Sequence, residues 1–126
     1  MWCLDTGHMT IGGQDTVDFA KKYASRVGHV HLKDVNMKSV PPVLSRKQSI
    51  MEGVQSGLFT PLGEGDVPIL ETVLALESAG YQGWYVIEQD TAITGAMPAE
   101  SSGPITGMKK SMDYLHNVVA PGVAAL

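Results

Sequence analysis

The stretch Val27-Gly28-His29-Val30-His31-Leu32-Lys33-Asp34 decides how this chain can fold. Its first six residues predict a short β-strand. Because side chains alternate between the two faces of a strand, the apolar residues at its even positions face a helix layer, whereas His29, His31 and Lys33 face the other way. Three polar groups on a buried face are costly without partners. The pattern therefore indicates that a metal and a polar substrate bind on that face.

Strand-like and helix-like segments alternate along the whole chain. We expect strands at residues 2–4, 27–32, 57–60 and 84–87, and helices at residues 15–25, 45–55, 68–79 and 105–118, with loops at 39–44 and 91–103. Such alternation implies parallel strands with right-handed crossovers. Four units are half of a (βα)8 barrel of about 250 residues. The predicted fold class is α/β, a parallel (βα)4 half of a TIM barrel at residues 1–118 with a C-terminal tail at 119–126.

Composition narrows the class of protein. The 126 residues are 44% hydrophobic and carry nine basic against thirteen acidic side chains, a net charge of −4. This predicts one packed domain and argues against a nucleic-acid partner, which requires a basic face. The longest apolar stretch, residues 118–126, is shorter than the ~20 residues of a membrane helix. No signal peptide is evident, so we expect a cytoplasmic protein whose single cysteine, Cys3, is a small core residue.

Polar residues follow three of the predicted strands. Asp5, His31 and Glu88 stand at the carboxyl ends of strands, where barrels of this type build their active sites. Two carboxylates and an imidazole suit Mn²⁺, Mg²⁺, Co²⁺ or Zn²⁺. Structural roles are the alternative: Asp5 could cap a turn, Glu88 could be a solvated strand end, and His29 could be a hydrogen-bonded core residue.

Four stretches together resemble one family. They are Leu4-Asp5-Thr6-Gly7-His8, then Gly28 to Asp34, then Phe59-Thr60-Pro61-Leu62-Gly63-Glu64-Gly65-Asp66, then Gly80 to Asp90. In this order they are similar to the xylose-isomerase-like TIM-barrel superfamily, and within it to inosose dehydratases and the sugar phosphate isomerase/epimerase group. The resemblance extends from about Leu4 to Leu115 and corresponds to strands five to eight, the C-terminal half of the barrel.

The resemblance implies a metal site and a set of site residues. The family binds one divalent metal through a Glu, an Asp, a His and a second Glu, which places Asp5, His31 and Glu88 as ligands. The first Glu would precede Met1. Mn²⁺ is the preferred metal, with Co²⁺, Mg²⁺ and Zn²⁺ as alternatives. His8 and Lys33 correspond to catalytic and substrate-contacting positions, and Asp34, next to Lys33, is expected to contact substrate.

The implied activity is that of a metal-dependent sugar or inositol enzyme, either inosose dehydratase-like or a sugar isomerase/epimerase. Such an enzyme abstracts a proton next to a metal-bound carbonyl and passes through an enediolate, with a small polyol or sugar as substrate. A second interpretation is an inactive half-barrel fragment or subunit that self-associates or pairs with a missing N-terminal half. A third is a metal-dependent nuclease, because apurinic endonucleases share the superfamily, and the net charge of −4 makes it the least favoured.

Overall fold

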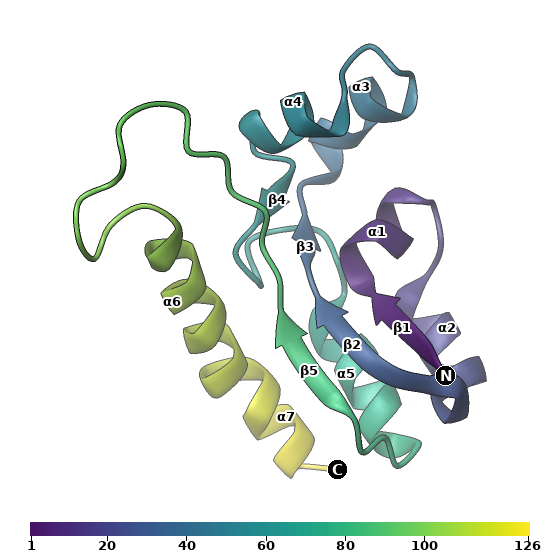
Figure 1. The fold of residues 1–126 in the computed structure, drawn as a ribbon. Helices are drawn as coiled ribbons and strands as arrows, with labels where there is room; N and C mark the ends of the chain where they lie inside the picture. Colours follow the sequence, from purple (N-terminus) through teal and green to yellow (C-terminus); the bar gives the residue numbers. More distant parts are fainter.

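The computed structural model describes residues 1–126 and contains a three-stranded parallel sheet (Figure 1). Its strands lie in the order β1 (Trp2–Asp5), β2 (Val27–Leu32) and β5 (Trp84–Ile87). Asp5 pairs with His31, and His31 in turn pairs with Val86. This register places the carboxyl ends of all three strands at one edge of the sheet, as the strand–helix alternation predicted.

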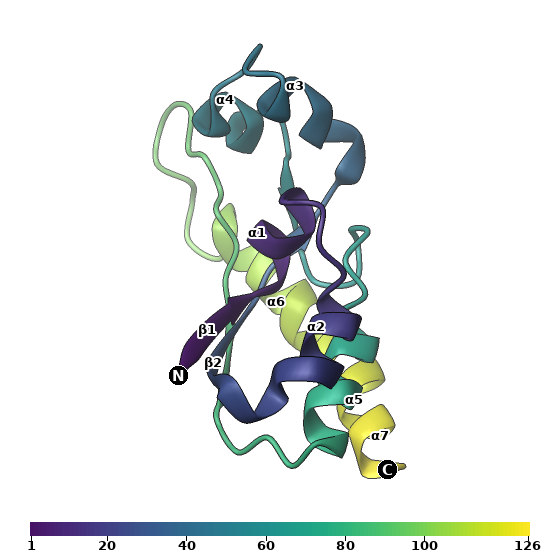
Figure 2. The same ribbon diagram turned by 90° about the vertical axis from the view of Figure 1, so that its right-hand side faces the viewer.

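Helices cover one face of this sheet (Figure 2). They are α2 (Thr16–Tyr23), α5 (Ile69–Ser78) and a C-terminal helix made of α6 (Pro104–Tyr114), a π-helical turn (Leu115–Val119) and α7 (Ala120–Ala124). The core lies between sheet and helices and includes Leu4, Val30, Leu32, Ile69, Val73 and Leu76. The predicted helices at 15–25 and 68–79 are confirmed, and so is the predicted placement of the even-numbered residues of β2 toward the helices.

The opposite face of the sheet carries no helix. Trp84 is 76% exposed there, and Cys3 is exposed as well. The prediction of Cys3 as a core residue is wrong, because alternation along β1 sends Leu4 into the core and Cys3 to the uncovered face.

The third predicted strand does not join the parallel sheet. It is shortened to β4 (Phe59–Thr60), which pairs antiparallel with β3 (Asp34–Val35) in a separate two-stranded sheet. The chain runs past the end of β2 into β3, and Pro61 lacks the amide that would extend β4. The expectation of four parallel strands is therefore wrong for one of them, and the domain is a partial TIM barrel without a closed barrel.

The excursion between β3 and β4 is more helical than expected. Residues 39–44, expected as a loop, contain the end of a 3₁₀ turn (Met37–Ser39) and α3 (Val40–Leu44), which tolerates its prolines because they occupy the first turn. The helix expected at 45–55 begins only at α4 (Ile50–Gln55). Ser49 starts it with a capping box in which Ser49 and Glu52 satisfy each other's backbone amides.

The two ends of the chain show further differences from expectation. A short helix, α1 (Thr6–Ile11), follows β1, and a 3₁₀ turn (Ala24–Arg26) precedes β2. Residues expected as a C-terminal tail continue the last helix, since α7 packs against α5. Residues 91–103 form no helix or strand, as predicted. No helix has the length and apolar character needed to cross a membrane.

Candidate metal centre

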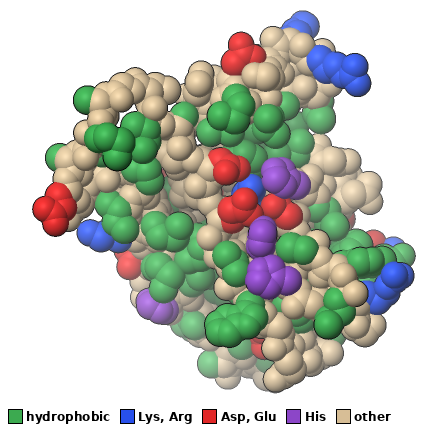
Figure 3. Space-filling view, viewed as in Figure 1, with side chains coloured by type: hydrophobic (Ala, Val, Ile, Leu, Met, Phe, Trp, Pro, Cys, Tyr) green, Lys and Arg blue, Asp and Glu red, His purple; other side chains and the backbone are tan.

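Three of the predicted ligands converge at the carboxyl edge of the sheet. Asp5, His31 and Glu88 each offer a ligand atom, and these atoms all lie within 4.8 Å of one another. They come from three adjacent strands and face the uncovered side of the sheet. In Figure 3 the histidine and carboxylate side chains gather around one cationic side chain at the middle of this face. The sequence-based placement of the triad is consistent with this geometry.

His31 and Glu88 make the closest contact within the triad. His31 Nδ1 lies 2.6 Å from Glu88 Oε2. Yet Glu88 Oε2 is buried and has no hydrogen-bond partner, because the two groups are not aligned for one. A buried carboxylate oxygen without a donor is costly, and a cation coordinated by both atoms would satisfy it. The residues present therefore fit a divalent metal.

Lys33 supplies the positive charge at the base of this cluster. Its side chain is fully buried, and Nζ lies 3.0 Å from Glu88 Oε1, 3.0 Å from Asp90 Oδ2 and 3.8 Å from Asp5 Oδ2. Burial on its own lowers the pKa of Lys33, but hydrogen bonds to Glu88 and Asp90 outweigh it and raise that pKa above its usual value. Conversely, Lys33 holds the pKa of Glu88 below its usual value, although burial opposes this.

Asp5 has two functions at once, because it caps α1 and belongs to the triad. Its Oδ1 accepts a hydrogen bond of 2.8 Å from the His8 amide, and its Oδ2 lies 3.0 Å from His8 Nδ1. The capping role named as the alternative is thus confirmed beside the ligand position. The buried Thr6 hydroxyl links this turn to β2 through hydrogen bonds with both the amide and the carbonyl of Lys33. A Cβ at Gly7 would approach Lys33 Cγ to 2.7 Å, which explains the glycine.

Asp34 does not join the triad. It is fully buried, and its two carboxylate oxygens accept hydrogen bonds from the amides of Gly63, Gly65 and Val67 at 2.9–3.0 Å. A further bond of 2.8 Å comes from Val35. The side chain expected to contact substrate therefore holds the loop between β4 and α5 in place.

Two residues near the site differ from the sequence-based interpretation. His29 is half-buried on the uncovered face and packs edge-on against His31, with ring centroids 5.1 Å apart, so it does not lie in the core. Asp90, which the sequence reasoning missed as a site residue, contacts Lys33 directly. The sequence position of Asp90 could have indicated this contact. In an extended chain, residues two positions apart, such as Glu88 and Asp90, point to the same side.

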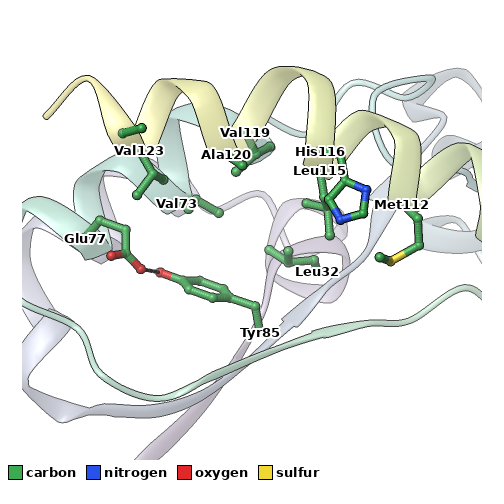
Figure 4. A pocket seen from close by; sticks show the side chains of 11 residues that line it. Leu32, Val73, Glu77, Tyr85, Met112, Leu115, His116, Val119, Ala120 and Val123 are labelled. Atoms are coloured by element: carbon green, nitrogen blue, oxygen red, sulfur yellow. Dashed lines mark hydrogen bonds between the residues drawn. The ribbon is translucent and has the colours of Figure 1, made fainter.

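A larger cavity lies away from this cluster (Figure 4). It measures about 460 Å³ between β5 and the C-terminal helix, and nine of its eleven lining residues are hydrophobic. The Tyr85 hydroxyl donates a hydrogen bond of 2.8 Å to Glu77 at its border. No member of the triad lines it, so it is separate from the candidate metal centre.

The parallel strand arrangement defines a partial α/β barrel, with a candidate metal triad at the carboxyl edge of its sheet. The chain belongs to the xylose isomerase-like TIM barrel family, whose model matches residues 2–118. This confirms the resemblance carried by the four sequence stretches.

Several curated relatives are inosose dehydratases. That of Mesomycoplasma hyopneumoniae (strain 7448) is 35% identical over 120 residues, covering 93% of this chain and 37% of the relative. That of Geobacillus thermodenitrificans is 41% identical over 91 residues, covering 71% of this chain and 30% of the relative. That of Clostridium perfringens (strain 13 / Type A) is 39% identical over 96 residues, covering 75% of this chain and 32% of the relative. The chain thus spans about a third of the length of the curated relatives it matches.

Proposed function

We propose that this chain carries the metal-binding part of a divalent-metal-dependent enzyme that acts on a small sugar or inositol derivative. The convergence of Asp5, His31 and Glu88 within 4.8 Å at the carboxyl edge of the sheet is the observation that carries the proposal. The similarity to inosose dehydratases favours dehydration over isomerisation or epimerisation. Both reactions begin with removal of a proton next to a carbonyl group.

The three ligands would hold one divalent cation, with Mn²⁺ preferred and Co²⁺, Mg²⁺ or Zn²⁺ as alternatives. When bound, such a cation polarises a carbonyl oxygen of the substrate as a Lewis acid. The donor set of two carboxylates and one imidazole suits these cations.

Two neighbouring residues would stabilise negative charge and transfer protons. Lys33 is fully buried and bonded to Glu88 and Asp90, so its positive charge would stabilise the negative charge of an enediolate through space and not by a direct hydrogen bond. His8 is half-exposed beside Asp5, and its ring would exchange a proton with a bound substrate. Loss of a β-hydroxyl from the enediolate as water, with a proton returned to that hydroxyl as its C–O bond breaks, would complete a dehydration. Reprotonation on another carbon or face would complete an isomerisation or epimerisation.

A second candidate function is that of a half-barrel that works only as part of an assembly. It is favoured by the uncovered sheet face, where Trp84 is 76% exposed and Val86 is 37% exposed. A second copy of this chain or a separate N-terminal half would cover that apolar surface. In this case the isolated chain would lack catalytic activity.

Calorimetric titration of Mn²⁺ tests the proposal directly. We expect the wild-type chain to bind the metal and the Asp5→Ala/His31→Ala/Glu88→Ala variant to lose binding while it still folds, as judged by circular dichroism. Unchanged affinity in a folded variant would refute the metal site. Sedimentation of the same samples tests the second candidate, because a well-behaved monomer with cooperative melting would argue against obligatory pairing.

A further inference from the structure

A hollow beside the metal triad has one polar wall and one apolar wall. It measures about 320 Å³. Its polar side is formed by His8, Asp90 and Thr91, and its apolar side by Phe59 together with residues of α4. In Figure 3 hydrophobic side chains lie directly next to the cluster of charged groups. The size falls within the lower range of small-molecule pockets, about 300–1,000 Å³.

The hollow lies next to the candidate metal centre, because two of its lining residues contact residues of that cluster although no triad member lines it. His8 lies 3.0 Å from Asp5 Oδ2, and Asp90 lies 3.0 Å from Lys33 Nζ. Phe59 joins the two walls, since its ring lies edge-on to His8 with centroids 5.9 Å apart and under Lys33 Nζ at 4.7 Å. A molecule bound at the triad would therefore have His8 and Asp90 beside it on the side of this hollow.

The apolar wall is exposed. Ile50 is 45% exposed and Met51 is 61% exposed on the first turn of α4, and Val54 stands one turn later. The capping box at Ser49 and Glu52 fixes the start of this helix. Local hydrogen bonds thus hold the wall in position. The exposure of its apolar side chains is not required for α4 to form.

The side chains that line the hollow disfavour anionic ligands. No Lys or Arg lines it. The nearest cation is Lys33, which is fully buried and already bonded to Glu88 and Asp90. A phosphate group in this hollow would meet the Asp90 carboxylate, and no Lys or Arg of the lining would compensate its charge.

We propose that Ile50 and Met51 form a specificity wall that receives the C–H face of an uncharged polyol and rejects phosphorylated sugars. Hydroxyl groups on the other side of the ligand would reach His8 and Asp90. This inference rests on the proposed function, since it assigns the ligand class of the same site. It makes α4 a determinant of specificity although it contributes nothing to the metal triad.

Binding of two probes tests this wall. We expect the Mn²⁺-loaded chain to bind myo-inositol, measured by calorimetry or saturation-transfer NMR, at least tenfold more tightly than glucose 6-phosphate. The Ile50→Ser/Met51→Ser variant should bind myo-inositol about fivefold more weakly, because apolar contact is lost. Met97→Ser is the matched control, since Met97 is 82% exposed and does not line the hollow. Both variants should bind Mn²⁺ as the wild type does.

The outcomes separate this inference from the proposed function. Equal myo-inositol affinity in the wild type and the double variant would overturn the wall, and so would tighter binding of glucose 6-phosphate or no binding of myo-inositol at all. Loss of Mn²⁺ binding in the wild type, with myo-inositol binding and its response to the double variant intact, would overturn the metal site and leave the wall standing.

Discussion

His31 Nδ1 lies 2.6 Å from Glu88 Oε2, although the two residues are 57 positions apart in the sequence and are not aligned for a hydrogen bond. They stand at the carboxyl ends of neighbouring parallel strands, β2 and β5. The sheet therefore brings together two ligand atoms, and Asp5 on the third strand completes the set.

The two histidines of β2 allow a test of the triad within one strand. His29 and His31 are two residues apart on the same face, yet only His31 belongs to the triad. We expect His31→Ala to weaken Mn²⁺ binding by at least about tenfold, because one of three ligands is lost. His29→Ala should leave it unchanged in the same calorimetric titration. Equal losses in both variants would place the metal elsewhere on this face.

Replacement of Lys33 tests the charge balance of the cluster. Lys33→Met leaves Asp5, Glu88 and Asp90 without their shared cation, so we expect the free energy of unfolding of the metal-free chain to fall by about 2–3 kcal/mol. Lys110→Met removes an exposed pair with Glu64 and should cost less than about 0.5 kcal/mol. Urea denaturation measures both. A similar small cost for the two variants would contradict the structural role of Lys33.

The buried carboxylate of Asp34 should be important for stability. In Asp34→Asn an amide NH₂ replaces one oxygen, so two backbone donors among Gly63, Gly65, Val67 and Val35 lose their acceptor. We expect a loss of about 2–3 kcal/mol in unfolding free energy. Asp66→Asn is the control, since its exposed side chain accepts one bond from Met37 and should cost under about 1 kcal/mol. Thermal melting followed by circular dichroism distinguishes the two.

Glu88 should make the metal-free chain sensitive to acid. Burial favours its neutral form, but Lys33 outweighs burial and lowers the pKa of Glu88 in the folded chain below its usual value of 4.5. A lowered folded pKa contributes stability that is present above the unfolded pKa and is lost as pH falls through the folded pKa. Since a third of the side chain is exposed, we expect a contribution of about 0.5–1 kcal/mol.

The corresponding measurement compares melting temperatures at about pH 6 and about pH 3, with a chelator present. Glu88→Gln should lose less stability than the wild type over this range. Glu64→Gln removes the charge of an exposed ion pair, so its change in melting temperature between the two pH values should equal that of the wild type. A wild-type acid response in Glu88→Gln would show that this carboxyl is not linked to folding.

Much of the architecture was predictable because it depends on local pattern. Alternation in β2 separates its apolar residues from His29, His31 and Lys33, and this is the arrangement found. The apolar stripe of α5 likewise predicts its length and buried face. The prediction failed where a short segment had no periodic pattern, as at α3, which was expected as a loop although its prolines occupy the first turn of a helix.

The site was predictable in part for the same reason. Asp5, His31 and Glu88 each follow a recognisable strand, so their meeting at one edge follows from parallel pairing. Asp34 also follows β2 in the sequence, but the chain turns away into β3 and buries its carboxylate under the Gly63–Asp66 loop. Lys33 and Asp34 are thus adjacent in sequence, yet Lys33 contacts the triad and Asp34 holds a loop.

The sequence by itself determined that Asp5, His31 and Glu88 follow strands, which face of the sheet the helices cover, and the family to which the chain belongs. Alternation and motif spacing are local properties, so a sequence shows them directly. Only the tertiary structure decided that β4 leaves the parallel sheet, that Cys3 and Trp84 lie exposed, and that Ile50 and Met51 of α4 line a hollow together with His8 and Asp90. These features depend on contacts between segments far apart in the chain, whose free energies no local pattern records.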